Sequence, residues 1–199
     1  MAESRDQAAT TVAALYVYRN GIYAGLPDVA IWDEERDARG YIGPHPVIAH
    51  PPCKAWSLMS NCRPEIVKDE DGGCFLSALW AVHAFGGVLE HPAHTRAWKK
   101  YGLPKPLKAG WSRSPDDPGW VCEVDQRWYG HEANKPTWLY YIGKSAPPDL
   151  IWGRAPKGSK TVGRSWGQGR DKGRSGTPPA FRDLLLAIAR RSVFSEVAA

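Results

Sequence analysis

The stretch PVIAHPPC, residues 46–53, decides the fold that we predict for this chain. Its apolar half at 46–50 predicts a short strand, and the strand must end at Pro51 and Pro52, because proline cannot continue a sheet ladder. Cys53 then follows on a loop at the carboxyl end of the strand. We therefore expect its thiol to be presented to a site and not packed away.

A helix and a second strand follow in GGCFLSALWAVHAFGGVLEHP, residues 72–92. Apolar residues recur at steps of three and four between Phe75 and Phe85, with glycine pairs on both sides, which predicts a helix with a core-facing stripe. Residues 88–90 predict the second strand, which carries Glu90. The segment as a whole is typical of a strand, helix, strand unit.

If the two strands are parallel neighbours, their carboxyl ends lie side by side. Open α/β sheets bind ligands at that edge. Cys53 and Glu90 would then face one pocket, as a nucleophile beside a proton donor or hydrogen-bond partner.

The segments before this unit are short. We expect residues 1–11 to be flexible, a strand at 15–18, and a tight turn that returns residues 22–23 as its hairpin partner. Residues 29–32 fit either a strand or a loop.

The segments after this unit predict more elements and a basic loop. Residues 93–100 suggest a short helix, and residues 120–124 and 136–142 predict an antiparallel pair of strands. Residues 157–176 are rich in Gly, Ser, Lys and Arg and predict a loop without a core of its own. Thr177 begins a final helix that ends near Arg191.

Length and composition point to a single α/β domain spanning residues 1–199. We expect a Rossmann-like, mixed but mainly parallel sheet with an irregular, basic C-terminal half. The net charge of +5 favours a phosphate-bearing partner, although a solvated surface explains it almost as well. Four cysteines at irregular spacing read as reduced thiols, no apolar run reaches membrane-spanning length, and we expect a cytoplasmic protein.

Three motifs in order carry a resemblance to a known family. His50-Pro51-Pro52-Cys53-Lys54-Ala55-Trp56-Ser57 resembles the Pro-Cys motif of DNA cytosine-5 methyltransferases. Leu89-Glu90-His91-Pro92 is similar to their Glu-Asn-Val/Pro motif, and Gln126-Arg127-Trp128-Tyr129 to their Gln-x-Arg-x-Arg motif. The chain also resembles short proteins of phages and prophages that carry the same His-Pro-Pro-Cys, Leu-Glu-His-Pro and Thr-Pro-Pro-Ala-Phe-Arg-Asp blocks, which would place it in the host cytoplasm.

The resemblance implies a role for each matching residue. Cys53 would be the nucleophile that adds to C6 of cytosine, Glu90 the partner of N3, and Arg127 the group that holds the adduct. The residues that the motifs place around them would bind substrate: Pro52, Trp56, Ser57, His91, Gln126 and Tyr129. If the substrate is duplex DNA, Trp56 or the loop after Cys53 could fill the gap left by a flipped base.

The one-carbon donor is left open by the sequence. The family's Phe-x-Gly-x-Gly loop for S-adenosylmethionine has no counterpart before Cys53, and neither does a phosphate loop or a Gly-x-Gly-x-x-Gly motif. We therefore expect a reduced cofactor half. The donor could be a differently bound S-adenosylmethionine, a folate-type donor, or none.

We thus expect a methyltransferase-like transferase that modifies C5 of a pyrimidine, with cytosine in DNA as the first choice. Two alternatives stay open: a non-catalytic phage protein that binds nucleic acid in counter-defence, and an enzyme acting on free pyrimidine nucleotides. We predict no metal site, because the cysteines form no Cys-x-x-Cys pair. Residues 54–71 fit a mobile lid or an ordinary surface loop equally well.

Overall fold

A computed structural model describes residues 10–57, 65–157, 160–161 and 176–193. A seven-stranded sheet forms its centre, in the order β2-β1-β3-β4-β8-β6-β5, and β7 and β9 form a separate parallel pair. The strands are β1 Val12–Leu15, β2 Val29–Trp32, β3 Val47–Ala49, β4 Gly87–Pro92, β5 Ser112–Arg113, β6 Trp120–Asp125, β7 Ala133–Asn134, β8 Pro136–Ile142 and β9 Lys160–Thr161. The helices are α1 Cys74–Phe85, α2 Arg96–Lys100 and α3 Pro179–Arg191, and short 3-10 helices include η1 Ala38–Gly40, η2 Lys54–Trp56 and η4 Gln126–Tyr129.

The sheet is mixed. Three pairs of strands are parallel: β2 with β1, β1 with β3, and β3 with β4. Three pairs are antiparallel: β4 with β8, β8 with β6, and β6 with β5. The mixed α/β character that we predicted is confirmed, but parallel and antiparallel pairings are balanced here, without a parallel majority. The predicted antiparallel pair is β6 and β8.

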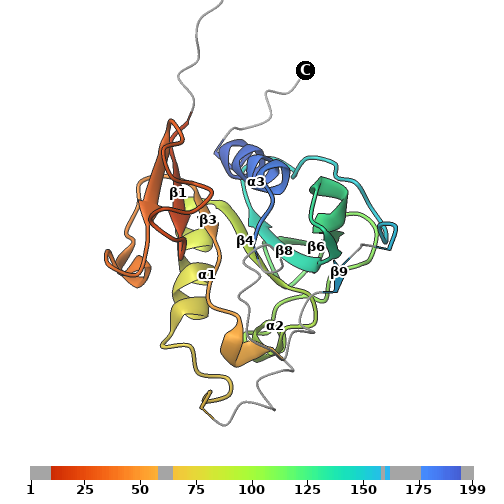
Figure 1. Cartoon of the computed structure of the whole chain (residues 1–199). Coiled ribbons are helices and arrows are strands. Elements are labelled where there is room, and N and C mark those ends of the chain that lie inside the picture. The colour runs from red at the N-terminus through yellow and green to blue at the C-terminus, as the bar shows by residue number, and fades with distance from the viewer. Residues whose placement is uncertain (1–9, 58–64, 158–159, 162–175, 194–199) are drawn as a thin grey trace, which may run out of the picture.

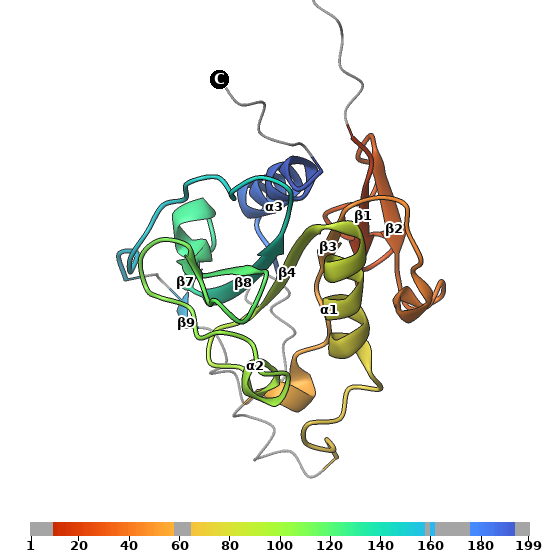
Figure 2. The same cartoon turned by 180° about the vertical axis from the view of Figure 1, so that it is seen from behind.

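Helices cover both faces of the sheet (Figures 1 and 2). Alternate residues of each strand point to opposite faces, so Ala13 and Leu15 join the core under α1, while Val12 and Ala14 join the core under α3. The face under α1 also receives α2. The described residues therefore form two apolar cores, one on each face of the sheet.

The contact between β3 and β4 depends on a glycine. Gly87 begins β4 with φ +117°, and a Cβ atom built there would lie 2.0 Å from the carbonyl oxygen of Val47. No other residue could occupy this position without moving one of the two strands. The register that follows pairs Ala49 with Leu89, so that His50 comes opposite Glu90.

The predicted hairpin between residues 15–18 and 22–23 is wrong. Strand β1 ends at Leu15, because Tyr16 takes a left-handed conformation with φ 61°. Residues 18–26 then form turns, and Tyr23 is buried there outside any strand. The partner of β1 is β2, which is parallel to it, so the segment that fitted either strand or loop is a strand.

The remaining predictions concern the two ends of the chain, the basic loop and two helices. Residues 1–9 and most of 157–176 lie outside them, so the expected flexible start and the basic loop are not described; β9 and Gly176 belong to the described part. The helix expected at 93–100 is shorter, at Arg96–Lys100, because the side chain of Thr95 caps it by accepting from the Ala97 amide. The final helix is present as α3, but its N-cap residue is Pro178 and not Thr177, and no side chain caps its start.

Candidate functional site

The site lies at the carboxyl ends of two adjacent parallel strands. Strand β3 is followed by His50, whose amide donates to the carbonyl of Leu15, and then by two prolines that lead to Cys53. Glu90 lies on the neighbouring strand β4, near its carboxyl end. The predicted juxtaposition of the two strand ends is therefore present, and it depends on the parallel pairing of β3 with β4.

Glu90 is buried and held by two side chains. It is 7% exposed, and its Oε2 lies 2.8 Å from Nδ1 of His50. Its Oε1 accepts a hydrogen bond of 3.0 Å from Nε2 of Gln126, which also donates to Oγ1 of Thr137 at 2.9 Å. Because both oxygens have partners, the carboxyl group is fixed in position and orientation.

The environment of Glu90 favours its ionised form. Burial acts to raise the pKa of the carboxyl group, but the hydrogen bond and charge of His50, with smaller effects of Lys135 and His91, outweigh it and lower the pKa to about 2. Glu90 is therefore a carboxylate at neutral pH.

Cys53 is partly buried at the start of the short helix η2. Burial raises the pKa of its thiol and the charge of Glu90 raises it further, while Lys135 and Lys54 act in the opposite direction. The resting group is thus a thiol at neutral pH. A reaction that uses the thiolate must remove this proton.

A small cavity opens beside Cys53. Its volume is about 230 Å³, which is below the ~300–1,000 Å³ of pockets for drug-sized ligands and suits a single ring. It is lined by Cys53, Ser57, His91, Pro92, Ala93, His94 and Thr95.

His91 forms a buried wall of this cavity. It is 1% exposed, and its ring meets Phe75 edge-on with a centroid distance of 5.2 Å. Burial lowers the pKa of His91 to about 4, although the nearby Glu90 charge acts in the opposite direction. The ring is therefore neutral at physiological pH, and it offers a polar group to a ligand without a charge.

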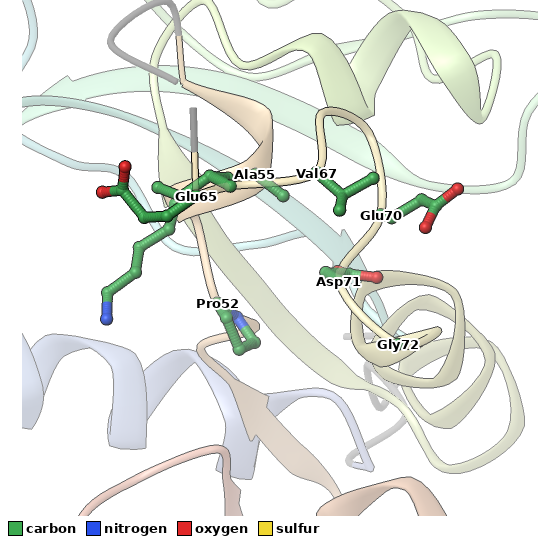
Figure 3. Close-up of a pocket in the computed structure, with 9 residues that line it drawn as sticks. Pro52, Ala55, Glu65, Val67, Glu70, Asp71 and Gly72 are labelled. Atoms are coloured by element: carbon green, nitrogen blue, oxygen red, sulfur yellow. The ribbon is translucent and has the colours of Figure 1, made fainter. Parts of the chain in front are cut away.

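A second cavity lies against the residues that flank Cys53 (Figure 3). Its volume is about 400 Å³, and Figure 3 shows it between the 52–55 segment and the segment that leads into α1. It is lined by Pro52, Lys54, Ala55, Glu65, Ile66, Val67, Glu70, Asp71 and Gly72. Pro52, which we expected to touch substrate, belongs to this second cavity.

Two of the predicted site residues have other partners. Arg127 donates from Nη1 to the backbone carbonyls of His131 and Glu132. Tyr129 accepts from the Ile151 amide and packs on Phe181, under α3. Neither is among the residues that line the two cavities.

Trp56 also lies away from the cavity. It is fully buried among aromatic side chains, and its Nε1 donates to Oδ2 of Asp71 at 2.8 Å. A side chain held in this way cannot swing out to replace a flipped base. The other end of this segment is also fixed, because Arg96 bonds to the carbonyls of Ala55 and Ser57 and to Asp69.

Sequence reasoning missed His50, Tyr23, Lys135 and Thr137. His50 stands inside the quoted motif, and its place opposite Glu90 follows once the two strands are paired in register. No sequence pattern pointed to Tyr23. Its Oη contacts Nε2 of His50 from the turns between β1 and β2, where no strand register predicts the position of a side chain.

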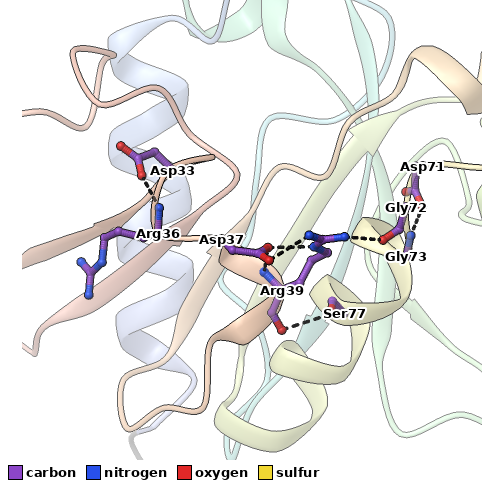
Figure 4. A network of polar contacts seen from close by, with 8 residues as sticks. All are labelled: Asp33, Arg36, Asp37, Arg39, Asp71, Gly72, Gly73 and Ser77. Atoms are coloured by element: carbon purple, nitrogen blue, oxygen red, sulfur yellow. Dashed lines mark hydrogen bonds and ion pairs between the residues drawn. The ribbon is translucent and has the colours of Figure 1, made fainter.

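A separate polar network fixes the carboxyl edge near β2 (Figure 4). Arg39 bonds to both oxygens of Asp37 and to the Gly72 carbonyl, and its own carbonyl accepts from Ser77. These bonds join η1 to the start of α1. Asp37 and Arg39 line neither cavity, so their role is to hold these elements together.

Comparison of the chain with protein-family models, with curated proteins and with solved structures gave no significant match. The family resemblance drawn from the three motifs therefore stays a prediction. Within the described ranges, no group of three or more His, Cys, Asp or Glu side chains could hold a metal ion. Cys62, one of the four cysteines of the chain, falls outside these ranges. None of the described helices is both long and apolar enough to cross a bilayer.

Proposed function

We propose that this protein modifies C5 of a pyrimidine, with cytosine in DNA as the first choice, by adding the Cys53 thiolate to C6. The observation that carries the proposal is the pairing of β3 with β4, which brings a cysteine and a fixed carboxylate to adjacent strand ends. Cys53 lines the ring-sized cavity, and Glu90, which does not line it, lies close enough for its charge to act on the Cys53 thiol. C5 of a pyrimidine is a poor nucleophile until a thiolate adds at C6. A carboxyl group that carries a proton near N3 can neutralise the negative charge that develops on the ring.

The order of the strands supports this location. From β1 the chain passes to β2 on one side and then to β3 on the other side, so the direction of winding reverses between β1 and β3. Open α/β sheets bind their ligands outside the carboxyl ends of the strands at such a switch point. The segment that follows β3 contains Cys53.

The proposed reaction has balanced steps. The Cys53 thiol gives its proton to water, the thiolate forms a bond to C6, electrons move onto the ring, and N3 takes a proton. C5 then binds an electrophile, which is a solvent deuteron in the exchange reaction, and loses its own proton to water. N3 gives up its proton, and the C6–S bond breaks to restore the thiolate. The residues that perform these steps are Cys53 at C6 and Glu90 at N3, while Gln126 orients Glu90.

The described residues do not fit a usual dinucleotide-type cradle. Such a cradle uses a glycine-rich turn and the first turn of a helix after the first strand. Here residues 16–28, between β1 and β2, contain turns and no helix. The proposed reaction therefore has no step that involves S-adenosylmethionine. A folate-type donor of the group at C5, or no donor, are the two candidates.

Exchange of the C5 hydrogen with solvent tests the proposal without a donor. Wild-type protein in D2O should place deuterium at C5 of cytosine in an oligonucleotide, as measured by mass spectrometry of the released nucleosides. Cys53→Ala should abolish the exchange. Cys74→Ala is the matched control, because it removes a partly buried thiol that lines neither cavity.

The same assay separates the alternatives. Exchange into free cytidine or deoxyuridine monophosphate, but not into DNA, would indicate an enzyme of the nucleotide pool. DNA binding that falls with salt, without exchange and without a new nucleoside in DNA of cells that express the chain, would indicate a non-catalytic binding protein. Either result would replace the proposal for cytosine in DNA.

A further inference from the structure

A line of hydrogen bonds leads from Glu90 into the interior of the protein. Nδ1 of His50 lies 2.8 Å from Oε2 of Glu90, and Nε2 of the same ring lies 2.9 Å from the hydroxyl of Tyr23. The side chains of His50 and Glu90 are 14% and 9% exposed, and Tyr23 is 2% exposed. The carboxyl group therefore exchanges protons with a histidine more directly than with bulk water.

The proposed chemistry requires a proton that Glu90 does not hold. N3 must be protonated as Cys53 adds at C6, yet Glu90 is ionised at neutral pH, because the effect of His50 and its other neighbours exceeds that of burial. Gln126 contacts the carboxylate as well, but a neutral amide cannot supply a proton. His50 is the titratable group in hydrogen-bond contact with Glu90.

We propose that His50 is the proton reservoir for Glu90, an inference that rests on the C6 addition proposed above. As the S–C6 bond forms, a proton passes from Nδ1 of His50 to Glu90 and from the carboxyl group to N3 of the pyrimidine. When the adduct collapses, the proton returns along the same path. No oxidant, reductant or co-reactant enters these transfers.

Tyr23 suits both charge states of His50. A hydroxyl group can accept from a protonated Nε2 or donate to a bare one, so this nitrogen keeps a partner throughout the cycle. Burial raises the pKa of Tyr23, which therefore remains a neutral phenol. Tyr23 thus holds the imidazole ring in place without competing for its proton.

Charged groups on neighbouring elements act on this line. Lys135 and His91 lie near Glu90, and Arg182 and Asp183 of α3 act on Tyr23. Lys135 favours the carboxylate together with His50, so the loss of His50 alone removes only part of the positive charge. The loss of His50 also removes the whole group that can donate a proton to Oε2 of Glu90.

The test compares wild-type protein with His50→Gln in the C5 exchange assay as a function of pH. Gln can still donate a hydrogen bond to Glu90, but it carries no transferable proton. We expect exchange to fall on the order of 100-fold at pH 7.5, since general acid catalysis contributes about 10²–10⁴-fold. The deficit should shrink as the pH falls, because Glu90 without His50 is protonated more readily from solvent.

Two further variants keep the test decisive. His83→Gln is the matched control, because His83 also shares a hydrogen bond with a tyrosine, Tyr140, at 2.8 Å but lies on α1 away from Cys53. It should leave exchange unchanged. His50→Ala should regain exchange when imidazole is added, in proportion to the imidazolium present, whereas a loss through misfolding would not be rescued.

The outcomes separate this inference from the proposed function. If wild-type protein exchanges C5 hydrogen and His50→Gln matches it at every pH, His50 is no reservoir, although the proposed function stands. A constant deficit at all pH values without imidazole rescue would show a structural role and would also overturn the inference. If wild-type protein shows no exchange, the proposed function fails and this inference fails with it.

Discussion

His50 and Glu90 face one another across the parallel strands β3 and β4, with Nδ1 of the histidine 2.8 Å from Oε2 of the glutamate. This contact connects the segment that carries Cys53 to the strand that carries the carboxylate. It also lowers the pKa of a carboxyl group whose burial alone would raise it. Several measurable properties of the protein depend on it.

The first prediction concerns the stability of the protein as a function of pH. The pKa of Glu90 is about 2 in the folded state against an ordinary value of 4.5, so the ionised group stabilises the fold above about pH 4.5 and this stabilisation is lost as pH falls through 2. The shift of this pKa corresponds to a contribution of Glu90 to the free energy of unfolding on the order of 3 kcal/mol. The difference in this free energy between wild type and Glu90→Gln should therefore shrink between pH 5 and pH 2, as measured by urea unfolding. A difference that is constant over this range contradicts the assigned charge state.

The second prediction concerns the reactivity of Cys53. Burial and the Glu90 charge raise the pKa of the thiol, so alkylation by iodoacetamide should be slow at pH 7 and should accelerate above pH 9. Glu90→Gln removes the negative charge and should speed alkylation at a fixed pH. Peptide-resolved mass spectrometry separates Cys53 from Cys74, which serves as the internal reference. Equal rates in both proteins would show that Glu90 does not act on the thiol.

The third prediction concerns Arg96, which joins α2 to the segment after Cys53. Its guanidinium group bonds to the carbonyls of Ala55 and Ser57 and to Asp69, so Arg96→Ala should destabilise the protein by about 1–3 kcal/mol and expose Cys53 to faster alkylation. Arg113→Ala is the control, because Arg113 lies exposed over the ring of Trp120. If both substitutions leave Cys53 unchanged, Arg96 does not hold this segment.

The fourth prediction tests the packing of β3 against β4. Gly87→Ala would place a Cβ atom 2.0 Å from the Val47 carbonyl oxygen and should destabilise the protein by several kcal/mol, or prevent folding. Gly110→Ala is the matched control: Gly110 also has a positive φ, +83°, but nothing lies within 4 Å of its Cβ position. It should cost only about 1–2 kcal/mol. Thermal unfolding of the two variants makes the comparison, and equal losses would exclude a steric role for Gly87.

Short sequence patterns predicted the central unit well. The proline stop after β3, the glycine pairs around α1 and the apolar run of β4 depend on local physics, so the strand, helix, strand unit could be read from them. The pairing of Cys53 with Glu90 at adjacent strand ends followed from the parallel arrangement. The hairpin prediction failed because the left-handed conformation of Tyr16, which ends β1, has no sequence signal.

The polar partners of the site were harder to predict. His50 follows from strand register, but Tyr23 comes from turns whose path depends on packing under α3, and no periodicity describes such a path. The motif with Gln126 and Arg127 pointed to a segment that contacts Glu90. Gln126 is buried against Glu90, whereas the guanidinium group of Arg127 bonds to backbone carbonyls of its own loop.

The central claim is that Cys53 forms a bond to C6 of a pyrimidine, and peptide mapping of a trapped adduct measures this most directly. An oligonucleotide with 5-fluorocytosine is incubated in an extract of cells that express the chain, so that any cellular donor is present. Fluorine cannot leave C5 as a proton does, so an adduct that has received a group at C5 persists. We expect a pyrimidine mass on the peptide that contains Cys53, and no such mass with Cys53→Ala. An unmodified Cys53 peptide together with no exchange of the C5 hydrogen, or an adduct on another residue, would contradict it.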